Sequence, residues 1–323
     1  MEYVQVAIGM ALLFAAGDLL VKGAVSAALK LEIPAILIGL TVVAFGTSAP
    51  ELFVTIQASI EGAPGIAVGN VVGSNIANVL LVIGLPALLA PLGDHSPETK
   101  RNYVIMMMVT IVAVGLCFQG PLSWWQGALL LSLLLLFLLD TYRCAMTHRA
   151  SVGESSCADI EELEDADPAM PNWKIAALIG LGMIGLPFGA DLAVTGAKVI
   201  AADMGLSEAA IGLTVIALGT SLPELATTVM AAIRRQADIA IGNVIGSNVF
   251  NLLCILGVAA TLDRIEIPPE FFSLNLWVMV LASAALAPFI WLRIKVGRIS
   301  GGVFVLAYVA YVALVLMPPS NGL

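Results

Sequence analysis

The chain has 323 residues, of which 60% are hydrophobic and only 11% are charged, and its formal net charge is −9. Soluble domains contain about 45–50% apolar and about 25% charged residues, so this composition excludes an ordinary soluble globular protein. Much of the negative charge lies in one stretch, Glu154 to Asp167, and no basic cluster favours nucleic-acid binding. The four cysteines show no CxxC spacing, so neither a disulfide scaffold nor a zinc site is expected.

Apolar runs that are long enough to cross a bilayer recur along the whole chain, since about 20 apolar residues span a hydrocarbon core of roughly 30 Å. We predict ten spans, at 4–29, 34–59, 65–90, 102–118, 123–142, 173–201, 208–233, 238–260, 273–292 and 299–317. The expected fold is an all-α polytopic membrane protein with a first five-helix repeat at 1–142, an acidic cytoplasmic loop at 143–172 and a second five-helix repeat at 173–323. The amino terminus lacks a basic segment, so no cleaved signal peptide is expected.

The second span contains a motif that the seventh span repeats. GLTVVAFGTSAPEL at Gly39 to Leu52 matches GLTVIALGTSLPEL at Gly212 to Leu225, and the offset between the copies is 173 residues. The third and eighth spans match at the same offset, with IAVGNVVGSNIANVLLVIG at Ile66 to Gly84 and IAIGNVIGSNVFNLLCILG at Ile239 to Gly257. Because each unit has an odd number of spans, the two units are predicted to lie in opposite orientations, as in many secondary transporters.

Each copy of the first motif places a glutamate, Glu51 or Glu224, in the middle of an apolar segment. A carboxylate at the bilayer centre costs roughly 2.5–3.5 kcal/mol, so two at matching positions indicate a function. A proline precedes each glutamate, and proline removes one N–H donor and loosens the preceding turn. We therefore expect free carbonyl oxygens near Ala44 to Thr47 and in the equivalent turn of the second copy, lining a cavity at the membrane midplane.

The second motif adds neutral oxygens. Ser74 and Asn78 are four residues apart and share one helix face, as do Ser247 and Asn251. Four further amides are expected to brace neighbouring helices, namely Asn70, Asn75, Asn243 and Asn248. An all-oxygen set with two carboxylates suits hard cations such as Ca²⁺, which takes about 6–8 oxygen ligands, and the lack of histidine and thiol argues against Zn²⁺ or Cu⁺.

These motifs resemble those of the cation/calcium exchanger superfamily, in particular its prokaryotic sodium/calcium exchanger branch. The resemblance implies a secondary antiporter that exchanges Ca²⁺ for Na⁺ by alternating access, with ions bound between the repeats and no cofactor. It implies that the carbonyl oxygens of Thr47 and Thr220 join Glu51 and Glu224 around Ca²⁺. The implied Na⁺ ligands and the remaining candidate oxygens are Ser74, Ser247, the carbonyls of Ala44 and Ala217, the hydroxyls of Ser48 and Ser221, and the central Asn78 and Asn251.

Two departures within the superfamily bear on the coupling ion. Some potassium-dependent relatives carry Asp where this chain has Asn251, so K⁺ dependence is disfavoured. Proton-coupled relatives typically show Gly-Asn-x-x-Glu where this chain has Gly-Thr-Ser-x-Pro-Glu, which favours Na⁺. The expected partners are Ca²⁺, Na⁺, H⁺ as a competitor at the glutamates, and the lipid bilayer, and a functional monomer is expected.

Other interpretations remain open at this point. Ca²⁺/H⁺ antiport is the alternative within transport, and a channel is another. An enzyme is not expected: Asp18 and Asp191 lack the glycine context of intramembrane aspartyl proteases, and both histidines lie in connections, away from Ser48. The serines and asparagines of the motifs could instead be interhelical contacts. Asp18 lies four residues before Lys22, so a local ion pair or a role in helix gating is favoured there over ion ligation.

Basic residues mark one side of the membrane. They lie beside alternate loops, at Lys30, Lys100, Arg101, Arg143, Arg149, Lys174, Arg234, Arg235, Arg293, Lys295 and Arg298. By the positive-inside rule, both termini lie outside a prokaryotic cell membrane and the 143–172 loop is cytoplasmic. The acidic loop lacks the glycine and spacing of an EF-hand, so a solvated linker is expected.

Overall fold

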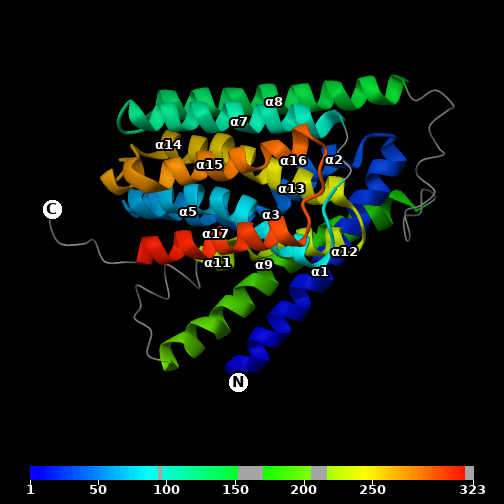
Figure 1. Cartoon of the computed structure of the whole chain (residues 1–323), viewed down its shortest axis with the longest axis horizontal. Helices are drawn as coiled ribbons and strands as arrows, with labels where there is room; N and C mark the ends of the chain where they lie inside the picture. The colour runs from blue at the N-terminus through cyan, green and yellow to red at the C-terminus, as the bar shows by residue number, and fades with distance from the viewer. Residues whose placement is uncertain (94–96, 152–169, 205–216, 317–323) are drawn as a thin grey trace.

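The computed structural model describes residues 1–93, 97–151, 170–204 and 217–316 (Figure 1). Eight helices in these ranges are long and apolar enough to cross a membrane, and a ninth span, 35–60, is a broken pair of helices bent by 46°. A shorter apolar helix, Leu222–Ile233, lies in the seventh predicted span, 208–233, whose beginning falls outside the described residues. The all-helical membrane fold predicted from the hydropathy pattern is thereby confirmed.

The first half contains the spans up to the acidic loop, and two of them are interrupted by π-helical turns. Its elements are α1 (Glu2–Leu31), α2 (Ala35–Ile38), η1 (Gly39–Val43), α3 (Ala44–Thr47), α4 (Ala49–Ile60), α5 (Pro64–Ala77), η2 (Asn78–Val82), α6 (Gly84–Leu89), α7 (Pro97–Phe118) and α8 (Trp124–Ser151). Residues 143–151, which the sequence analysis assigns to the loop, continue α8. The acidic stretch Glu154 to Asp167 lies outside the described residues.

The second half repeats this plan. Its elements are α9 (Asn172–Asp203), α11 (Ala217–Thr220), α12 (Leu222–Ile233), α13 (Ala237–Phe250), η5 (Asn251–Ile255), α14 (Leu256–Leu262), η6 (Phe271–Asn275), α15 (Leu276–Ala285), α16 (Ala287–Trp291) and α17 (Arg298–Leu316). The π-helical turns η2 and η5 begin 173 residues apart, at Asn78 and Asn251, so the two halves share this local distortion.

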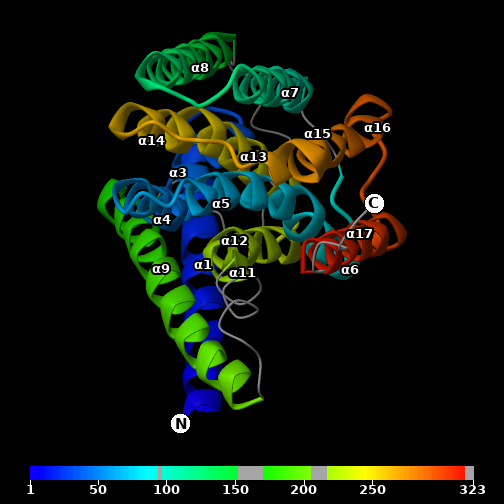
Figure 2. The same cartoon turned by 90° about the vertical axis from the view of Figure 1, so that its left-hand side faces the viewer.

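Helices α1 and α9 cross the remaining helices obliquely and extend beyond them at one side (Figures 1 and 2). They pack against each other through glycines: a Cβ on Gly9 would lie 2.5 Å from the Ala193 nitrogen, and one on Gly182 would lie 2.7 Å from the Leu20 Cβ. The beginning of α1, at Gly9, therefore contacts the later part of α9, at Ala193, and Leu20 further along α1 contacts the earlier Gly182. These equivalent helices are thus antiparallel. This confirms the opposite orientation of the two repeats.

Turns outside the bundle follow the same symmetry. Gly62 and Arg235, which are 173 residues apart, both have positive φ, 69° and 56°. Gly120 and Arg293 form a second such pair, with φ values of 117° and 52°. Glycine adopts this left-handed conformation without strain, whereas arginine does so at a cost of about 1–2 kcal/mol. The backbone of the duplicated unit is therefore retained even where its sequence has changed.

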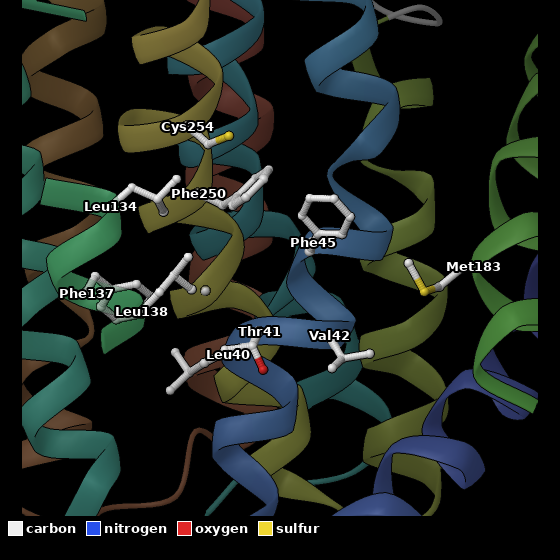
Figure 3. A pocket seen from close by; sticks show the side chains of 11 residues that line it. Leu40, Thr41, Val42, Phe45, Leu134, Phe137, Leu138, Met183, Phe250 and Cys254 are labelled. Atoms are coloured by element: carbon white, nitrogen blue, oxygen red, sulfur yellow. The ribbon is translucent and has the colours of Figure 1, made fainter. Parts of the chain in front are cut away.

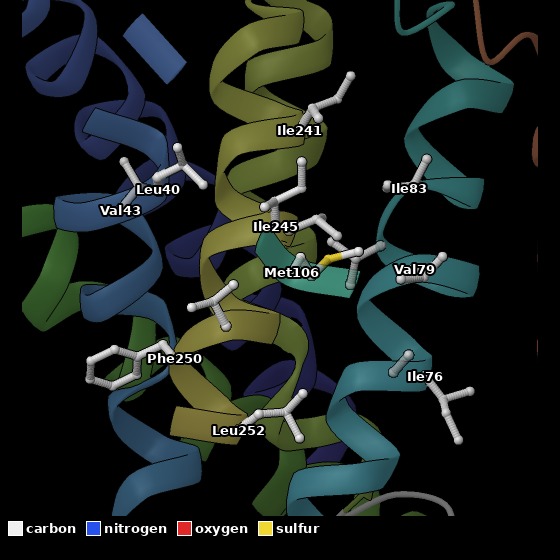
Figure 4. Packing of buried hydrophobic residues seen from close by; sticks show 14 of the residues in the cluster. Leu40, Val43, Ile76, Val79, Ile83, Met106, Ile241, Ile245, Phe250 and Leu252 are labelled. Atoms are coloured by element: carbon white, nitrogen blue, oxygen red, sulfur yellow. The ribbon is translucent and has the colours of Figure 1, made fainter. Parts of the chain in front are cut away.

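The centre of the bundle is helix α13, in which every residue from Ile239 to Phe250 is buried. Apolar side chains of the first half pack around it, and those that Figure 4 labels include Leu40 and Val43 of η1, Ile76, Val79 and Met106 of α7. Close approach is possible because Gly242 and Gly246 of α13 face the backbone of Ile36 and Leu40. The core therefore holds α13 directly beside the broken span of the first repeat.

Candidate functional site

The two glutamates lie where the broken spans change direction. Ser48 separates α3 from α4 with φ −85° and ψ 7°, and Ser221 separates α11 from α12 with φ −88° and ψ 3°. A proline follows in the first turn of each second segment, and Glu51 and Glu224 come directly after it. Their side chains are 1% and 0% exposed. Each carboxylate thus sits at the N-terminal end of a helix, where the helix dipole favours negative charge.

Hydrogen bonds between the repeats bring these two breaks together. The Ser48 hydroxyl donates to Glu224 Oε1 at 2.9 Å, and the Thr47 hydroxyl donates to Asn243 Oδ1 at 3.2 Å. Glu51 follows Ser48 by three residues in the first turn of α4, so the bond from Ser48 places the helix end that carries Glu51 beside Glu224. The predicted convergence of the two motifs is therefore seen in the structure.

Asparagines brace the second segments from the neighbouring helices, as expected. Asn70 Nδ2 donates to the Glu51 carbonyl at 3.0 Å and to Thr55 Oγ1 at 2.9 Å. Asn243 Nδ2 makes the equivalent bonds, to the Glu224 carbonyl at 3.4 Å and to Thr228 Oγ1 at 3.1 Å. Thr55 and Thr228 were not predicted as members of the site, although their 173-residue offset matches that of the two motifs.

The amides of the second motif meet across the interface of the repeats. Asn78 Nδ2 donates to Asn248 Oδ1 at 3.1 Å, and Asn248 Nδ2 donates to the Asn75 carbonyl at 3.4 Å. Asn75 itself bonds the Val71 carbonyl of its own helix at 2.7 Å. Asn248 thus braces the interface, while Asn78 keeps its carbonyl oxygen for another partner.

Several buried polar atoms of the site have no hydrogen-bond partner within the described part of the chain. They are Glu51 Oε1 and Oε2, Glu224 Oε2, Asn78 Oδ1, Ser221 Oγ, Ser247 Oγ, and both amide atoms of Asn251. An unsatisfied buried polar group costs about 1–3 kcal/mol, and more when it is charged. Native proteins contain few of them, so a cluster of this size indicates atoms that are arranged for a ligand.

The other predicted ligands lie close by along the chain. Ser74 is buried on α5, as is Ser247 on α13, and Thr220 is buried at the end of α11. The Ala44 carbonyl accepts from the Ser48 N–H at 3.0 Å, and the Thr47 hydroxyl, 3.3 Å away, shares its single proton between this carbonyl and Asn243 Oδ1. Ala217 begins α11, at the boundary of the described residues.

The chemistry of this cluster is that of oxygen. It holds two carboxylates, and no group of three or more His, Cys, Asp or Glu side chains that could hold a metal exists among the described residues. Most candidate metal ligands of the cluster are therefore the neutral oxygens of hydroxyls, amides and backbone carbonyls. Such a set can bind hard cations, which prefer oxygen, and offers no soft ligand for Zn²⁺ or Cu⁺.

A separate hollow of about 460 Å³ lies beside η1 and α3 of the broken span. Its lining is apolar and comes from both repeats, including Phe45, Leu134, Met183 and Phe250 (Figure 3). The only hydroxyl in its lining, that of Thr41, already donates to the Leu37 carbonyl at 2.7 Å. Because its lining is apolar and includes neither Glu51 nor Glu224, this hollow is distinct from the glutamate cluster.

Comparison with known proteins agrees with this geometry. The sequence model of the family described as "Sodium/calcium exchanger protein" matches residues 1–142 and 174–317. The chain belongs to the sodium/calcium exchanger family. The match leaves out residues 143–173 of this exchanger-family chain, and these coincide with the predicted acidic loop at 143–172.

Relatives cover nearly the whole exchanger-family chain. The sodium/calcium exchanger MaX1 of Methanosarcina acetivorans is 30% identical over 337 residues, with 95% of this chain and 96% of its own length covered. Inner membrane protein YrbG of Escherichia coli is 36% identical over 288 residues, with 88% of this chain and 87% of its own covered. The sodium-calcium exchanger NCX_Mj, soaked with 10 mM Na⁺ and 10 mM Sr²⁺, has a TM-score of 0.81 at 31% identity, covering 98% of this chain and 99% of its own. The family resemblance and the inverted-repeat fold predicted from the motifs are confirmed.

Proposed function

We propose that this protein is a secondary active antiporter that exchanges Ca²⁺ for Na⁺ across a cell membrane by alternating access. One observation carries the proposal: carboxylates from two opposed repeats meet in a buried cluster whose remaining oxygens have no protein partner. Membership of a family of exchangers supports it further. The cluster lies between the repeats, where transporters of inverted design bind their ions.

The donor set supports a particular division of roles. Glu51 and Glu224 would balance the charge of one Ca²⁺, with the carbonyls of Thr47 and Thr220 and the hydroxyls of Ser48 and Ser221 adding oxygens. Two Na⁺ would balance the same two carboxylates and three would leave an excess of one positive charge, using Ser74, Ser247, and the carbonyls of Ala44 and Ala217. Asn78 and Asn251 would line the centre, since each begins a π-helical turn, and such turns are frequent at functional sites.

Ion binding at the Ala44 carbonyl requires a local change. This carbonyl accepts from the Ser48 N–H and shares the proton of the Thr47 hydroxyl with Asn243 Oδ1. The hydroxyl can rotate away at little cost, because Thr47 also lies 3.2 Å from Asn243 Oδ1 and can donate there alone. One lone pair of the carbonyl would then be available for Na⁺.

The topology of the proposed antiporter follows from its basic residues. Both termini lie outside the cell, and the loop at 143–172 between the repeats at 1–142 and 173–323 is cytoplasmic. The helix α8 reaches Ser151 and places Arg149 in its last turn, near Glu32 at 3.8 Å, so both residues belong to the cytoplasmic side. The protein would act as a monomer, because each chain contains both halves of the site.

The test is ⁴⁵Ca²⁺ uptake by proteoliposomes that hold the purified protein. An outward Na⁺ gradient at equal pH, with the voltage clamped by K⁺ and valinomycin, is expected to drive uptake. Liposomes containing Glu51→Gln protein are the control. Uptake driven by a pH gradient but not by a Na⁺ gradient would replace the proposal with Ca²⁺/H⁺ antiport. Equally fast Ca²⁺ entry without any counter-ion would indicate a channel.

A further inference from the structure

The described part of the structure departs from its internal symmetry where α1 meets the opposite repeat. Helix α1 packs along α12 of the opposite repeat, and a Cβ on Gly17 would lie 3.2 Å from the backbone of Ala226. The equivalent helices, α9 and α4, make no comparable contact in the part of the chain that the structure describes. Meanwhile α12 and α4 make equivalent contacts with α6 and α14. The asymmetry therefore belongs to the α1–α9 pair, which lies against the second repeat.

An ion pair lies at this asymmetric contact. Arg234, directly after α12, donates from Nε to Asp18 Oδ1 of α1 at 2.5 Å, and Lys22 lies 3.3 Å from the other carboxylate oxygen. The side chains of Asp18 and Arg234 are only 22% and 18% exposed. The ion pair predicted between Asp18 and Lys22 is thus confirmed, and Arg234 adds a contact between the repeats that the sequence analysis did not foresee.

The equivalent positions in the inverted arrangement carry different charges. Adding the 173-residue offset to Asp18 and Lys22 gives Asp191 and Thr195, and subtracting it from Arg234 gives Glu61. Asp191 is exposed and takes part in no ion pair among the described residues. Glu61 is also exposed and accepts from Gln57 Nε2 at 2.8 Å. In the contact seen here, the side chains of Lys22 and Arg234 surround the Asp18 carboxylate. The equivalent positions hold two carboxylates, Asp191 and Glu61, and the neutral Thr195.

We infer that the Asp18–Arg234 ion pair holds the transporter in the access state seen here, and that no equivalent ion pair stabilises the opposite state. This inference rests on the proposed alternating access. In an inverted repeat, the opposite state exchanges the conformations of the halves, so α9 would lie against α4. Asp191 would then approach Glu61, and two like charges would meet where unlike charges meet now. The two states therefore differ in energy, and the resting population favours the present one.

A purely structural ion pair would behave differently. Removing it would lower the stability of the protein without changing how α1 lies relative to the rest of the bundle. A pair that stabilises one state would change the distribution between two positions of α1. In addition, Glu61→Arg would create the missing ion pair with Asp191 and favour the opposite state, although Glu61 touches nothing in the present α1–α12 contact.

The test measures distances between spin labels at Tyr3 of α1 and Ile111 of α7, both exposed, in a background without the native cysteines. One distance population should dominate before further substitution. Asp18→Asn, Arg234→Gln and Glu61→Arg should each move the ratio of the two populations toward the minor one, by about three- to ten-fold. Arg101→Gln, which breaks the ion pair with Asp140 between α7 and α8, is the control and should leave the ratio unchanged.

A double variant separates the electrostatic explanation from any general disturbance. Adding Asp191→Asn to Glu61→Arg should restore the original ratio, because the new arginine then has no carboxylate to meet. An unchanged ratio in Arg234→Gln and Glu61→Arg overturns the inference, as does a shift that persists in the double variant. Glu61 and Asp191 are exposed, so these variants keep the fold even if Asp18→Asn does not. The distances do not depend on which ion drives transport, so Na⁺ coupling can fail while this inference stands.

Discussion

The Ser48 hydroxyl donates to Glu224 Oε1 at 2.9 Å, whereas the hydroxyl of Ser221, the equivalent serine of the other repeat, has no partner within the described residues. The two serines occupy the same position in their motifs and nearly the same backbone conformation. The difference between them is therefore a property of the conformation rather than of the motif. As a result, Glu51 keeps both carboxylate oxygens without a partner and Glu224 keeps one.

This inequality predicts unequal effects of two identical substitutions. In ion-free protein, Ser48→Ala should lower the free energy of unfolding by about 1.5–3 kcal/mol, the usual contribution of a hydrogen bond to a charged group. Ser221→Ala should change it by less than about 0.5 kcal/mol. Thermal unfolding in detergent with a cation chelator measures both. Equal losses would show that the two serines have equivalent partners in solution.

The two glutamates are expected to be indispensable for Ca²⁺ exchange. Glu51→Gln or Glu224→Gln removes one of the two charges that balance the divalent ion, so Ca²⁺ affinity should fall at least about 100-fold, or on the order of 3 kcal/mol. Ca²⁺-dependent thermal stabilisation and ⁴⁵Ca²⁺ uptake measure the loss. Glu270→Gln, at an exposed carboxylate, is the matched control. Retained exchange in both site variants would refute the assignment of these residues as ligands.

Protons should compete with Ca²⁺ for the same carboxylates. Each glutamate must be ionised to bind a cation, so the Ca²⁺ concentration for half-maximal uptake should rise as the pH falls, with equal pH on both sides of the membrane. High Ca²⁺ should restore the rate at low pH. A fall in the maximal rate that Ca²⁺ cannot reverse would instead indicate that protonation acts elsewhere.

Asn251 is predicted to govern which cations the site accepts. Its amide is fully buried, and neither of its side-chain polar atoms has a partner in the described part of the chain. Asn251→Asp adds a third negative charge, which should favour binding of an additional cation and change the dependence of uptake on Na⁺, K⁺ or Ca²⁺. Asn251→Ser, which adds no charge, is the control. Identical ion dependence in wild type and Asn251→Asp would place this residue outside the ion pathway.

Much of the fold and of the site's composition could be predicted because duplication left a constant offset. Matching positions identified Glu51 with Glu224 and Asn78 with Asn251, and the odd number of spans fixed the orientation of the repeats. Helix ends were less predictable: Arg143 and the residues after it suggested a loop, yet α8 continues to Ser151. Polar residues indicate where a helix leaves the membrane, but its backbone hydrogen bonds can continue into water.

The asymmetry between the repeats could not be predicted from motifs that are nearly identical. Which serine donates to a glutamate, and which repeat α1 packs against, depends on the conformation as a whole. The partner of Asp18 illustrates this, because Arg234 lies 216 residues away and its equivalent, Glu61, has the opposite charge. The π-helical turns at Asn78 and Asn251 were also unexpected, since no residue pattern in the motif predicts the extra residue in the turn.

The glycine contacts between α1 and α9 lead to the last prediction. A Cβ on Gly9 would lie 2.5 Å from the Ala193 nitrogen and 2.8 Å from the Gly189 carbonyl oxygen, and backbone atoms cannot move aside as a flexible side chain can. Gly9→Ala should therefore separate the helices and lower the free energy of unfolding by about 1–3 kcal/mol. Gly180→Ala is the control, because a Cβ there would meet nothing within 4 Å. Alanine favours a helix over glycine by about 1 kcal/mol, so the control should be neutral or more stable. Equal melting temperatures for the two variants would show that α1 and α9 do not depend on this close approach.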